Sequence, residues 1–580
     1  MKPTITHPVD PCPPQAGAFL CFSSSHRAAA FLCAAGLLLS AAPSWGDSIW
    51  IADEGSWHEG SNWNTFGAPF VPTASDVVAI GGPDSITNVT GEADAKLVNI
   101  SNGATLNVAG SGASLTIPSP AEIDDDFGWV NVGIGSGSGT LNIRDGATVT
   151  AGVSLGASNG TPGTVTIDGP GSTWTSPAGI EAYLGWRGDA SLTVSNGGTL
   201  AADSILMTGL SGSGFSDVNA SAVLNIGAPS GESPAAPGII NAASITANTP
   251  GTTGEISSTV VFNHNDEMGY VFAPNIGGSL HVRHENGLTF PSGGFTHTGS
   301  TTVAGGALAI AGLTTTSDIS VHEGALLSVS GLLGVANGGT IHVDGALIAP
   351  GASLSIANDI TLSGSGTVVA STTIGSNGIL APGNSAGILS GTSETWAGGG
   401  KYLWEINQAN GLPGAQWDLR QLSESLTITA NSGTPFVLEL ISLDMDDNPG
   451  ALANWDPYQT GQFWPIATAG SPITTFDPAA FLIDFDQFIL VNPGTDPNGF
   501  SLALSNDQQS LLLHYDTDIA AIPEPGSAVA LALLLAGSTG LHRHRGRKAC
   551  SQKQRGSQTD RSAAFLSSLP GAPGQRPSCL

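Results

Sequence analysis

The chain has 580 residues, of which 79 are glycine and 36 are proline, and only 11% are charged. Helical bundles and coiled coils need many Lys, Glu and Arg residues on their solvent-facing sides, so this composition excludes them. A disordered chain is equally excluded, because 40% of the residues are hydrophobic. The composition predicts a large, glycine-rich all-β protein.

Charge and cysteine are unevenly distributed. The formal net charge is −30, and only six basic residues lie between residues 47 and 522. A region this acidic lacks the cationic patches that bind phosphates, which excludes nucleic acid as a partner. The same region contains no cysteine, which excludes disulfides and Cys-ligated zinc there and suits an oxidising compartment.

Residues 1–46 contain the features of a secretory signal peptide. Arg27 precedes the apolar run Ala28 to Leu39, and the small residues Ser44 and Gly46 precede Asp47. A basic residue, a short apolar segment and small residues in this order predict export, with a buried helix as the alternative. The Trp-rich segment 47–75 is expected to cap the first structural repeat and to cover its open strand edge.

Residues 76–400 contain a recurring motif in which two aliphatic residues at i and i+2 are followed by a glycine and a third aliphatic residue. The copies are Val98, Ile100, Gly103 and Leu106; Leu141, Ile143, Gly146 and Val149; and Leu192, Val194, Gly197 and Leu200, with a looser copy at 163–174. Copies that start at residues 141, 165 and 192 have a period in the twenties, which indicates a solenoid.

The motif has a direct physical interpretation. Aliphatic residues at i and i+2 point to the same side of a strand, and the glycine permits a turn with positive φ. One such coil cannot bury its inner face alone, whereas coils stacked about 4.8 Å apart pair their backbones and bury it. We therefore expect a right-handed parallel β-helix. A β-sandwich is the competing all-β fold, but it gives no reason for glycine at a fixed offset.

The pattern changes after residue 400. The segments around Trp417, "SLTITA" and "PFVLELISL" are typical of ordinary antiparallel strands, and loops rich in Pro and Asp follow them. We expect residues 401–520 to form a C-terminal antiparallel β cap or small domain.

Residues 521–548 contain Pro523-Glu524-Pro525, a mostly apolar stretch from Ala528 to Leu541, and a basic cluster with Arg543, Arg545 and Arg547. Fourteen helical residues span about 21 Å, so flanking residues would be needed to cross a hydrocarbon core of about 30 Å. Residues 549–580 are expected to form a basic disordered tail.

These three features, in this order, resemble the PEP-CTERM sorting signal of Gram-negative bacteria. The resemblance implies that an exosortase recognises Pro523, Glu524 and Pro525 and cleaves nearby after transient anchoring in the inner membrane, and that the protein accompanies exopolysaccharide and biofilm systems. Residues 139–200 resemble repeats shared by PEP-CTERM proteins and autotransporter passengers. Thr296 to Gly312 resembles the autotransporter-associated β-strand repeat, and residues 378–389 and 402–428 resemble the closing part of such passengers.

Several motifs invite a catalytic or metal-binding interpretation. Gly383 to Gly387 matches G-x-S-x-G around Ser385, but a strand-like segment follows where a nucleophile elbow needs a helix, so we expect a turn. His58-Glu59, His284-Glu285 and His322-Glu323 lack the second histidine of a zinc protease and are expected to be surface residues. Glu122 with Asp124–Asp126, and Asp444 with Asp446–Asn448, are expected to be solvated acidic loops, with Ca²⁺ binding as the alternative.

The sequence therefore predicts an exported, non-enzymatic structural or adhesive rod at the cell surface or in the extracellular matrix. No catalytic, cofactor-binding or metal-ligating residue is assigned. The expected partners are the exosortase and an exopolysaccharide or cell-surface glycan. Two hypotheses stay open: a glycan-cleaving β-helix enzyme, hydrolase or lyase, with paired carboxylates, and a Ca²⁺-stabilised adhesin.

Overall fold

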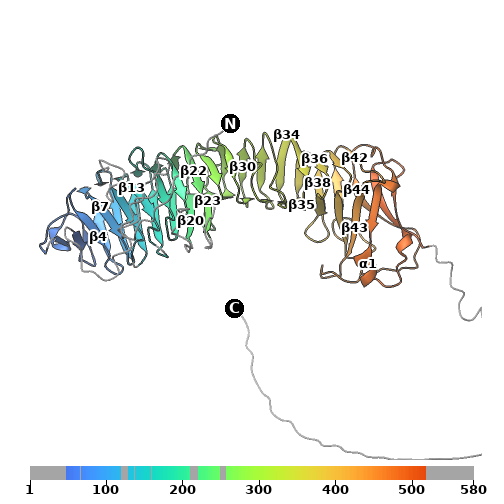
Figure 1. The fold of residues 1–580 in the computed structure, drawn as a ribbon, viewed down its shortest axis with the longest axis horizontal. Helices are drawn as coiled ribbons and strands as arrows, with labels where there is room; N and C mark the ends of the chain where they lie inside the picture. Colours follow the sequence, from blue (N-terminus) through green and yellow to red (C-terminus); the bar gives the residue numbers. More distant parts are fainter. Residues whose placement is uncertain are drawn as a thin grey trace, which may run out of the picture. The chain divides into compact units, whose positions relative to one another are not determined.

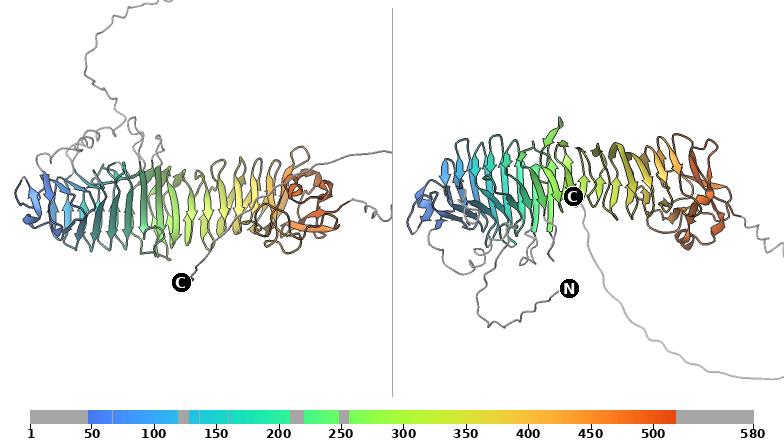
Figure 2. Two further views of the ribbon diagram at one scale, coloured as in Figure 1. Left: turned by 90° about the horizontal axis from the view of Figure 1, so that it is seen from below. Right: turned by 45° about the horizontal axis from the view of Figure 1, so that its top comes forward.

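The computed structural model describes residues 47–65, 67–118, 128–135, 137–158, 160–208, 220–247 and 256–517. They belong to one compact unit, along which the strands lie side by side (Figures 1 and 2). The predicted signal peptide at 1–46, the sorting signal at 521–548 and the tail at 549–580 lie outside the described residues.

The described chain is all-β. Its only helices there are α1 (Asp486–Val491) and three 3-10 turns, η1 (Gly60–Asn62), η2 (Pro478–Ala480) and η3 (Pro497–Gly499). No helix within the described ranges is long and apolar enough to cross a membrane, and the apolar segment predicted at 528–541 lies beyond them.

The first two sheets both start at the N-terminal end of the unit; sheet 1 extends to residue 297 and sheet 2 to residue 484. Sheet 1 consists of β1 (Asp47–Trp50), β3 (Trp63–Thr65), β4 (Val77–Ile80), β7 (Leu97–Ile100), β10 (Trp129–Val132), β13 (Gly152–Leu155), β16 (Ala182–Leu184), β19 (Ile205–Met207), β22 (Ser244–Ala247), β25 (Asn275–Gly278) and β28 (Phe295–His297). Sheet 2 consists of β2 (Glu54–Ser56), β5 (Ile86–Val89), β8 (Ala104–Ala109), β11 (Gly139–Arg144), β14 (Gly163–Asp168), β17 (Ala190–Ser195), β20 (Ala220–Gly227), β23 (Ile256–Asn263), β26 (His281–Asn286), β29 (Thr301–Val303), β31 (Ile319–Val321), β33 (Thr340–Val343), β35 (Thr361–Gly364), β37 (Ile379–Pro382), β40 (Lys401–Ile406), β43 (Phe436–Ser442) and β45 (Phe481–Asp484).

Two further sheets complete the coils, one in each half of the unit. Sheet 3 consists of β6 (Glu92–Asp94), β9 (Ser114–Thr116), β12 (Thr148–Thr150), β15 (Thr173–Thr175), β18 (Thr199–Ala201) and β21 (Ile239–Asn241). Sheet 4 consists of β24 (Tyr270–Phe272), β27 (Leu288–Pro291), β30 (Ala307–Ile310), β32 (Leu326–Val329), β34 (Ala346–Ile356), β36 (Thr367–Ile374), β38 (Ile388–Gly391), β39 (Glu394–Trp396), β41 (Leu419–Leu422), β42 (Leu426–Ile428), β44 (Gln462–Thr468), β46 (Phe500–Leu504) and β47 (Ser510–Tyr515).

The chain passes through the sheets in a fixed order. β10, β11 and β12 belong to sheets 1, 2 and 3, and β13, β14 and β15 repeat that order one coil later. Strands of the stacked coils pair in parallel with their counterparts in the neighbouring coils, as β11 does with β8 and β14. Long parallel sheets of this kind are those of a β-helix or other solenoid, in agreement with the predicted all-β fold class.

The aliphatic residues of the predicted motif form the core. Leu141, Val165 and Leu192 are register neighbours on successive coils of sheet 2, and each side chain is fully buried. The turn beyond the strand has the predicted backbone conformation, since φ is 58° at Asp145 and 79° at Gly146. Aspartate, asparagine and glycine are the residues that adopt this conformation most readily.

Two details of the predicted organisation are wrong. The sequence aligned Val98 with Leu141, but Leu106 is the residue that lies opposite Leu141, whereas Val98 lies in sheet 1 opposite Val130. Strands β7 and β8 carry the same aliphatic alternation, so the sequence alone does not show which of them pairs with β11. The sequence also predicted ordinary antiparallel strands after residue 400. Instead β40, β43 and β45 continue the parallel pairing, and antiparallel pairing there joins β47 to β44 and β46.

The Trp-rich segment at the start packs as a cluster. β3 pairs antiparallel with β1, while β1 pairs in parallel with β4 on its other side. Trp63 lies between Trp50 and Trp57, with ring centroids 4.9 and 4.8 Å away in edge-to-face contacts. All three side chains are buried and belong to the hydrophobic core that continues through the coils.

Candidate functional site

A row of half-buried polar residues follows the outer face of sheet 2 across successive coils. Its members are register neighbours that alternate along each strand with buried residues: Arg283, Thr302, Ser320, His342 and Ser363, and the row ends opposite Ala381. Because coils repeat at one strand spacing, side chains far apart in the sequence are close in this row. His342 and Ser363, for example, are 21 positions apart and directly opposite each other.

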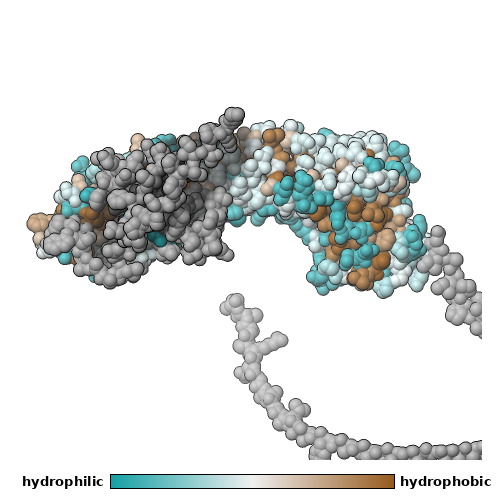
Figure 3. All heavy atoms as spheres, viewed as in Figure 1, coloured by the Kyte–Doolittle hydropathy of each residue, from teal (hydrophilic) through white to brown (hydrophobic). Residues whose placement is uncertain are grey.

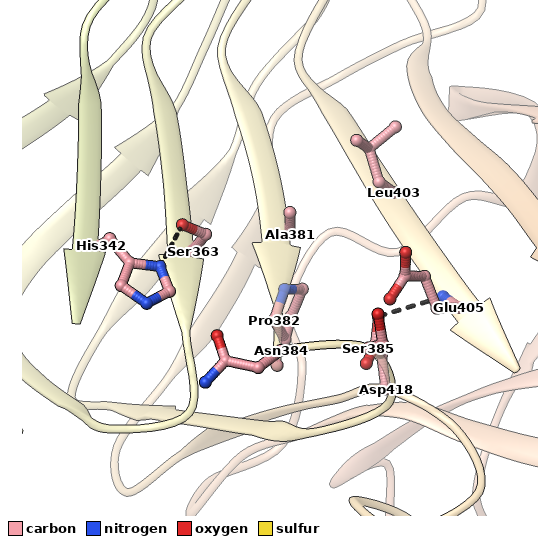
Figure 4. A pocket seen from close by; sticks show the side chains of 10 residues that line it. His342, Ser363, Ala381, Pro382, Asn384, Ser385, Leu403, Glu405 and Asp418 are labelled. Atoms are coloured by element: carbon pink, nitrogen blue, oxygen red, sulfur yellow. Dashed lines mark hydrogen bonds between the residues drawn. The ribbon is translucent and has the colours of Figure 1, made fainter. Parts of the chain in front are cut away.

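A cavity of about 260 Å³ lies at the end of this row. Part of the row, the loop after β37, Leu403 and two acidic residues border it. The lining residues are His342, Ser363, Ala381, Pro382, Gly383, Asn384, Ser385, Leu403, Glu405 and Asp418 (Figure 4). Hydroxyl, imidazole, amide and carboxyl groups therefore converge on one hollow, which is the usual character of a ligand site.

Three side chains on one side of the cavity form a hydrogen-bonded relay. Nδ1 of His342 is 3.0 Å from the Ser363 hydroxyl, and Nε2 of His342 is 3.0 Å from Oδ2 of Asp344. The side chains of His342 and Asp344 are 32% and 23% exposed, so they are within reach of solvent.

Asp344 is held as a carboxylate. Burial raises its pKa, but hydrogen bonds from the Ser365 backbone N–H, the Asn384 amide, the Ser365 hydroxyl and His342 outweigh this and keep the pKa below its ordinary value. An ionised Asp344 accepts a hydrogen bond from Nε2–H of His342, so neutral His342 has its free lone pair on Nδ1, facing Ser363.

The other side of the cavity is a tight loop held by two carboxyl groups. Asp418 accepts hydrogen bonds from the backbone N–H groups of Gly387, at 2.7 Å, and Glu405, at 3.0 Å. Ser385 and Ala386 have φ angles of 76° and 46°, a conformation that is costly for residues other than glycine. Buried Asp418, together with half-buried Glu405 through its hydrogen bond from Ala386 N–H, thus holds a strained turn in place.

The pKa values of both carboxyl groups are raised above their ordinary values. Burial raises the pKa of Asp418 well above its ordinary value, despite the two backbone hydrogen bonds. Burial also raises the pKa of Glu405, against a lowering hydrogen bond from Ala386 N–H, and the charge of Asp447 raises it further. Asp418 is fully buried, so of the two only Glu405 can contact a ligand in the cavity.

The outcome for the G-x-S-x-G motif agrees with the turn that the sequence predicted. The motif connects β37 with β38, so a strand and not a helix follows Ser385. Ser385 borders the cavity opposite His342 (Figure 4), and no hydrogen bond joins it to a histidine in the described part of the chain. The serine that contacts a histidine here is Ser363, which no local motif marks.

The three His-Glu pairs differ from one another. His58 and His322 are exposed, as expected. The prediction of a surface position is wrong for His284, which is fully buried together with His264 and His297. Burial lowers the pKa of both His284 and His297 to about 4. These histidines lie at inward positions of the coils, where hydroxyl groups and backbone carbonyls bind them.

The acidic runs give no metal centre among the described residues, where no group of three or more His, Cys, Asp or Glu residues could hold an ion. Glu122 and Asp124–Asp126 lie outside the described ranges. In the second loop, Asp444 Oδ1 accepts hydrogen bonds from the backbone N–H groups of Asp446 and Asn448, so this carboxylate shapes its own turn.

The proposed sorting residues Pro523, Glu524, Pro525, Arg543, Arg545 and Arg547 all lie outside the described residues. No protein-family model matches the chain, and no curated protein is significantly similar to it.

Proposed function

We propose that this chain is an exported structural or adhesive protein of the cell surface or extracellular matrix, associated with exopolysaccharide. The observation that carries the proposal is the stack of parallel coils, which repeats a polar outer face many times over a continuous aliphatic core. A repeated face of this kind suits a polymeric partner, because each coil adds another set of similar contacts. The chain that forms it contains no cysteine between residues 47 and 522.

In this proposal the fold is a right-handed parallel β-helix, and β44, β46 and β47 contribute to an antiparallel C-terminal cap. Residues 1–46 direct export. An exosortase recognises Pro523, Glu524 and Pro525, and the apolar segment with Arg543, Arg545 and Arg547 holds the protein in the inner membrane until cleavage. Support for this sorting step comes from the order of motif, apolar segment and basic cluster in the sequence.

Cell fractionation tests the proposal. The full chain is expressed in a Gram-negative host that makes an exosortase and an exopolysaccharide, beside the triple variant P523A/E524A/P525A. We expect wild-type protein in the surface and polysaccharide fractions and the variant in the inner membrane. The matched control R555Q/R561Q changes the tail and should behave like wild type. Equal distribution of wild type and the triple variant would contradict the proposal.

The alternative of a glycan-cleaving enzyme with paired carboxylates has one observation in its favour, since Glu405 and Asp418 border the same cavity. Their hydrogen bonds favour a structural role, because fully buried Asp418 uses both oxygens to bind backbone N–H groups. An E405Q variant separates the two: release of reducing ends from the host polysaccharide by wild type, and its loss in E405Q, would support the enzyme.

A further inference from the structure

We infer that the outer face of sheet 2 carries a site that hydrolyses short, uncharged acyl esters, with Ser363 as nucleophile, His342 as general base and Asp344 as the group that orients His342. This activity goes beyond the proposed structural role. It also departs from the expectation, based on the sequence, that the chain carries no catalytic site.

His342 is the third residue of β33, and Asp344 follows directly after this strand, where its carboxylate reaches the imidazole. Parallel register then sets Ser363 directly opposite His342. Both contacts of the imidazole measure 3.0 Å, within the range expected between a nucleophile, its base and the group that orients the base.

The hydrogen bonds of Asp344 determine which nitrogen of His342 carries the proton. Asp344 accepts three further hydrogen bonds, two from Ser365 and one from Asn384, all at 3.0 Å and all to Oδ1. Oδ2 is thus left for His342, and this fixes the tautomer with the proton on Nε2. The Ser363 hydroxyl therefore donates to Nδ1, the direction in which a base removes the proton.

The adjoining cavity determines the class of substrate. Beside Ser363 it is bordered by the apolar side chains of Ala381, Pro382 and Leu403, which suit a small acyl group such as acetyl. The net charge of −30 disfavours acidic substrates. An O-acyl group on a neutral polysaccharide fits these requirements and the proposed partner.

The reaction balances without a cofactor. Ser363 Oγ attacks the ester carbonyl carbon while its proton passes to His342 Nδ1, and Asp344 stabilises the resulting imidazolium. The tetrahedral intermediate collapses, the ester C–O bond breaks, and the departing alcohol takes the proton from Nδ1. Water then attacks the acyl-serine by the same route and releases the carboxylic acid. Asn384 uses one hydrogen of its amide nitrogen for Asp344, and we assign the other to the oxyanion.

The chain contains a natural control for this geometry. His281 Nδ1 is 2.9 Å from the Ser300 hydroxyl, but the Ser300 backbone N–H also donates to that nitrogen at 2.9 Å. In the described part of the chain, no carboxylate is hydrogen-bonded to His281, whereas His342 has Asp344. A histidine–serine contact without an orienting carboxylate should not activate the serine.

The test uses the purified full chain, a fluorophosphonate probe and p-nitrophenyl acetate. We expect covalent labelling, mapped by mass spectrometry to Ser363, and hydrolysis that falls at least 100-fold in S363A, H342A and D344N. S300A should retain both labelling and hydrolysis. N384A leaves Ser363 unchanged but should reduce hydrolysis by about 100-fold. Circular dichroism confirms the fold of each variant.

Absence of labelling, labelling of Ser385 or Ser300, or full hydrolysis by folded S363A would overturn the inference. These outcomes would not affect the fractionation experiment, which tests export and sorting. Mislocalisation of the protein would likewise not affect the labelling experiment, which tests the Ser363 site.

Discussion

His264 and His284 share one hydroxyl group, because their Nε2 atoms lie 2.8 and 3.0 Å from Thr289 Oγ1. The Asp266 backbone N–H points to His264 Nδ1, at 3.3 Å, so His264 carries its proton on Nε2 and donates to Thr289. His284 Nδ1 is 2.9 Å from the Gly305 carbonyl oxygen and must carry the proton there. The threonine then donates to His284 Nε2. The hydrogen bonds that connect His264, Thr289 and His284 require both histidines to be neutral.

This arrangement predicts loss of stability in acid. Burial lowers the pKa of His284 and His297 from 6.5 to about 4 in the folded chain, so below pH 6.5 the unfolded chain binds more protons. The free energy of unfolding therefore falls as the pH falls from 6.5 towards 4, by up to about 3 kcal/mol for each of these histidines. Urea denaturation at several pH values measures it.

The matched variants for this prediction are H284Q and H322Q. H284Q should weaken the dependence on pH between 6.5 and 4, whereas H322Q changes an exposed histidine and should leave it unchanged. Stability that stays constant between pH 7 and pH 4 would contradict the assigned proton positions.

A buried ion pair near the C-terminal end makes a second prediction. Arg420 donates from Nε and Nη2 to Glu394 Oε2, at 2.9 and 2.6 Å, and Trp396 donates to the other carboxylate oxygen at 2.7 Å. Both side chains of the ion pair are at most 1% exposed. E394Q should lower the free energy of unfolding by about 3–5 kcal/mol, because it leaves the arginine charge buried and unpaired.

The control is the half-exposed pair Lys401–Glu439, whose side chains are 36% and 23% exposed. E439Q should cost less than about 1 kcal/mol. Similar losses for E394Q and E439Q in urea denaturation would contradict the burial of the Arg420 pair.

The aliphatic row inside the coils gives a third prediction. Leu192 is fully buried between register neighbours Val165 and Leu224. L192A should reduce the free energy of unfolding by about 2–5 kcal/mol, through lost apolar contact and the cavity left behind. Leu332, whose side chain is 76% exposed, supplies the control, and L332A should change stability by less than about 0.5 kcal/mol.

Close contact between coils gives a fourth prediction. A Cβ atom at Gly163 would lie 2.2 Å from the Val132 carbonyl oxygen of the preceding coil, whereas at Gly351 it would meet nothing within 4 Å. G163A should therefore force the coils apart and lower the melting temperature, while G351A should not. An equal effect of both substitutions would contradict the stacking.

An apolar area adjoins hydrophilic side chains on the C-terminal part of the unit, in the view of Figure 3. Leu482 of β45 and Leu490 of α1 are 54% and 73% exposed in this part of the chain. Exposed apolar side chains here do not contribute to the continuous core, so the stability of the coils should not depend on them.

The sequence predicted what short segments determine and missed what depends on the length of loops. Leu141 with Ile143, and Leu192 with Val194, identified core strands because the aliphatic alternation and the turn glycine are local. The predicted register was wrong at Val98, because two strands of one coil carry similar patterns. His342 and Ser363 meet only because one coil happens to contain 21 residues, and no local pattern reveals that number. His284 was misplaced because a polar residue at an inward position needs partners from other coils.

Mass spectrometry of the protein recovered from the surface fraction of cells reports both ends of the mature chain and so tests export and sorting together. We predict a polypeptide that begins near Asp47 and ends near Pro523-Glu524-Pro525. A protein that is recovered intact from Met1 to Leu580 and remains inside the cells would contradict export, sorting and display.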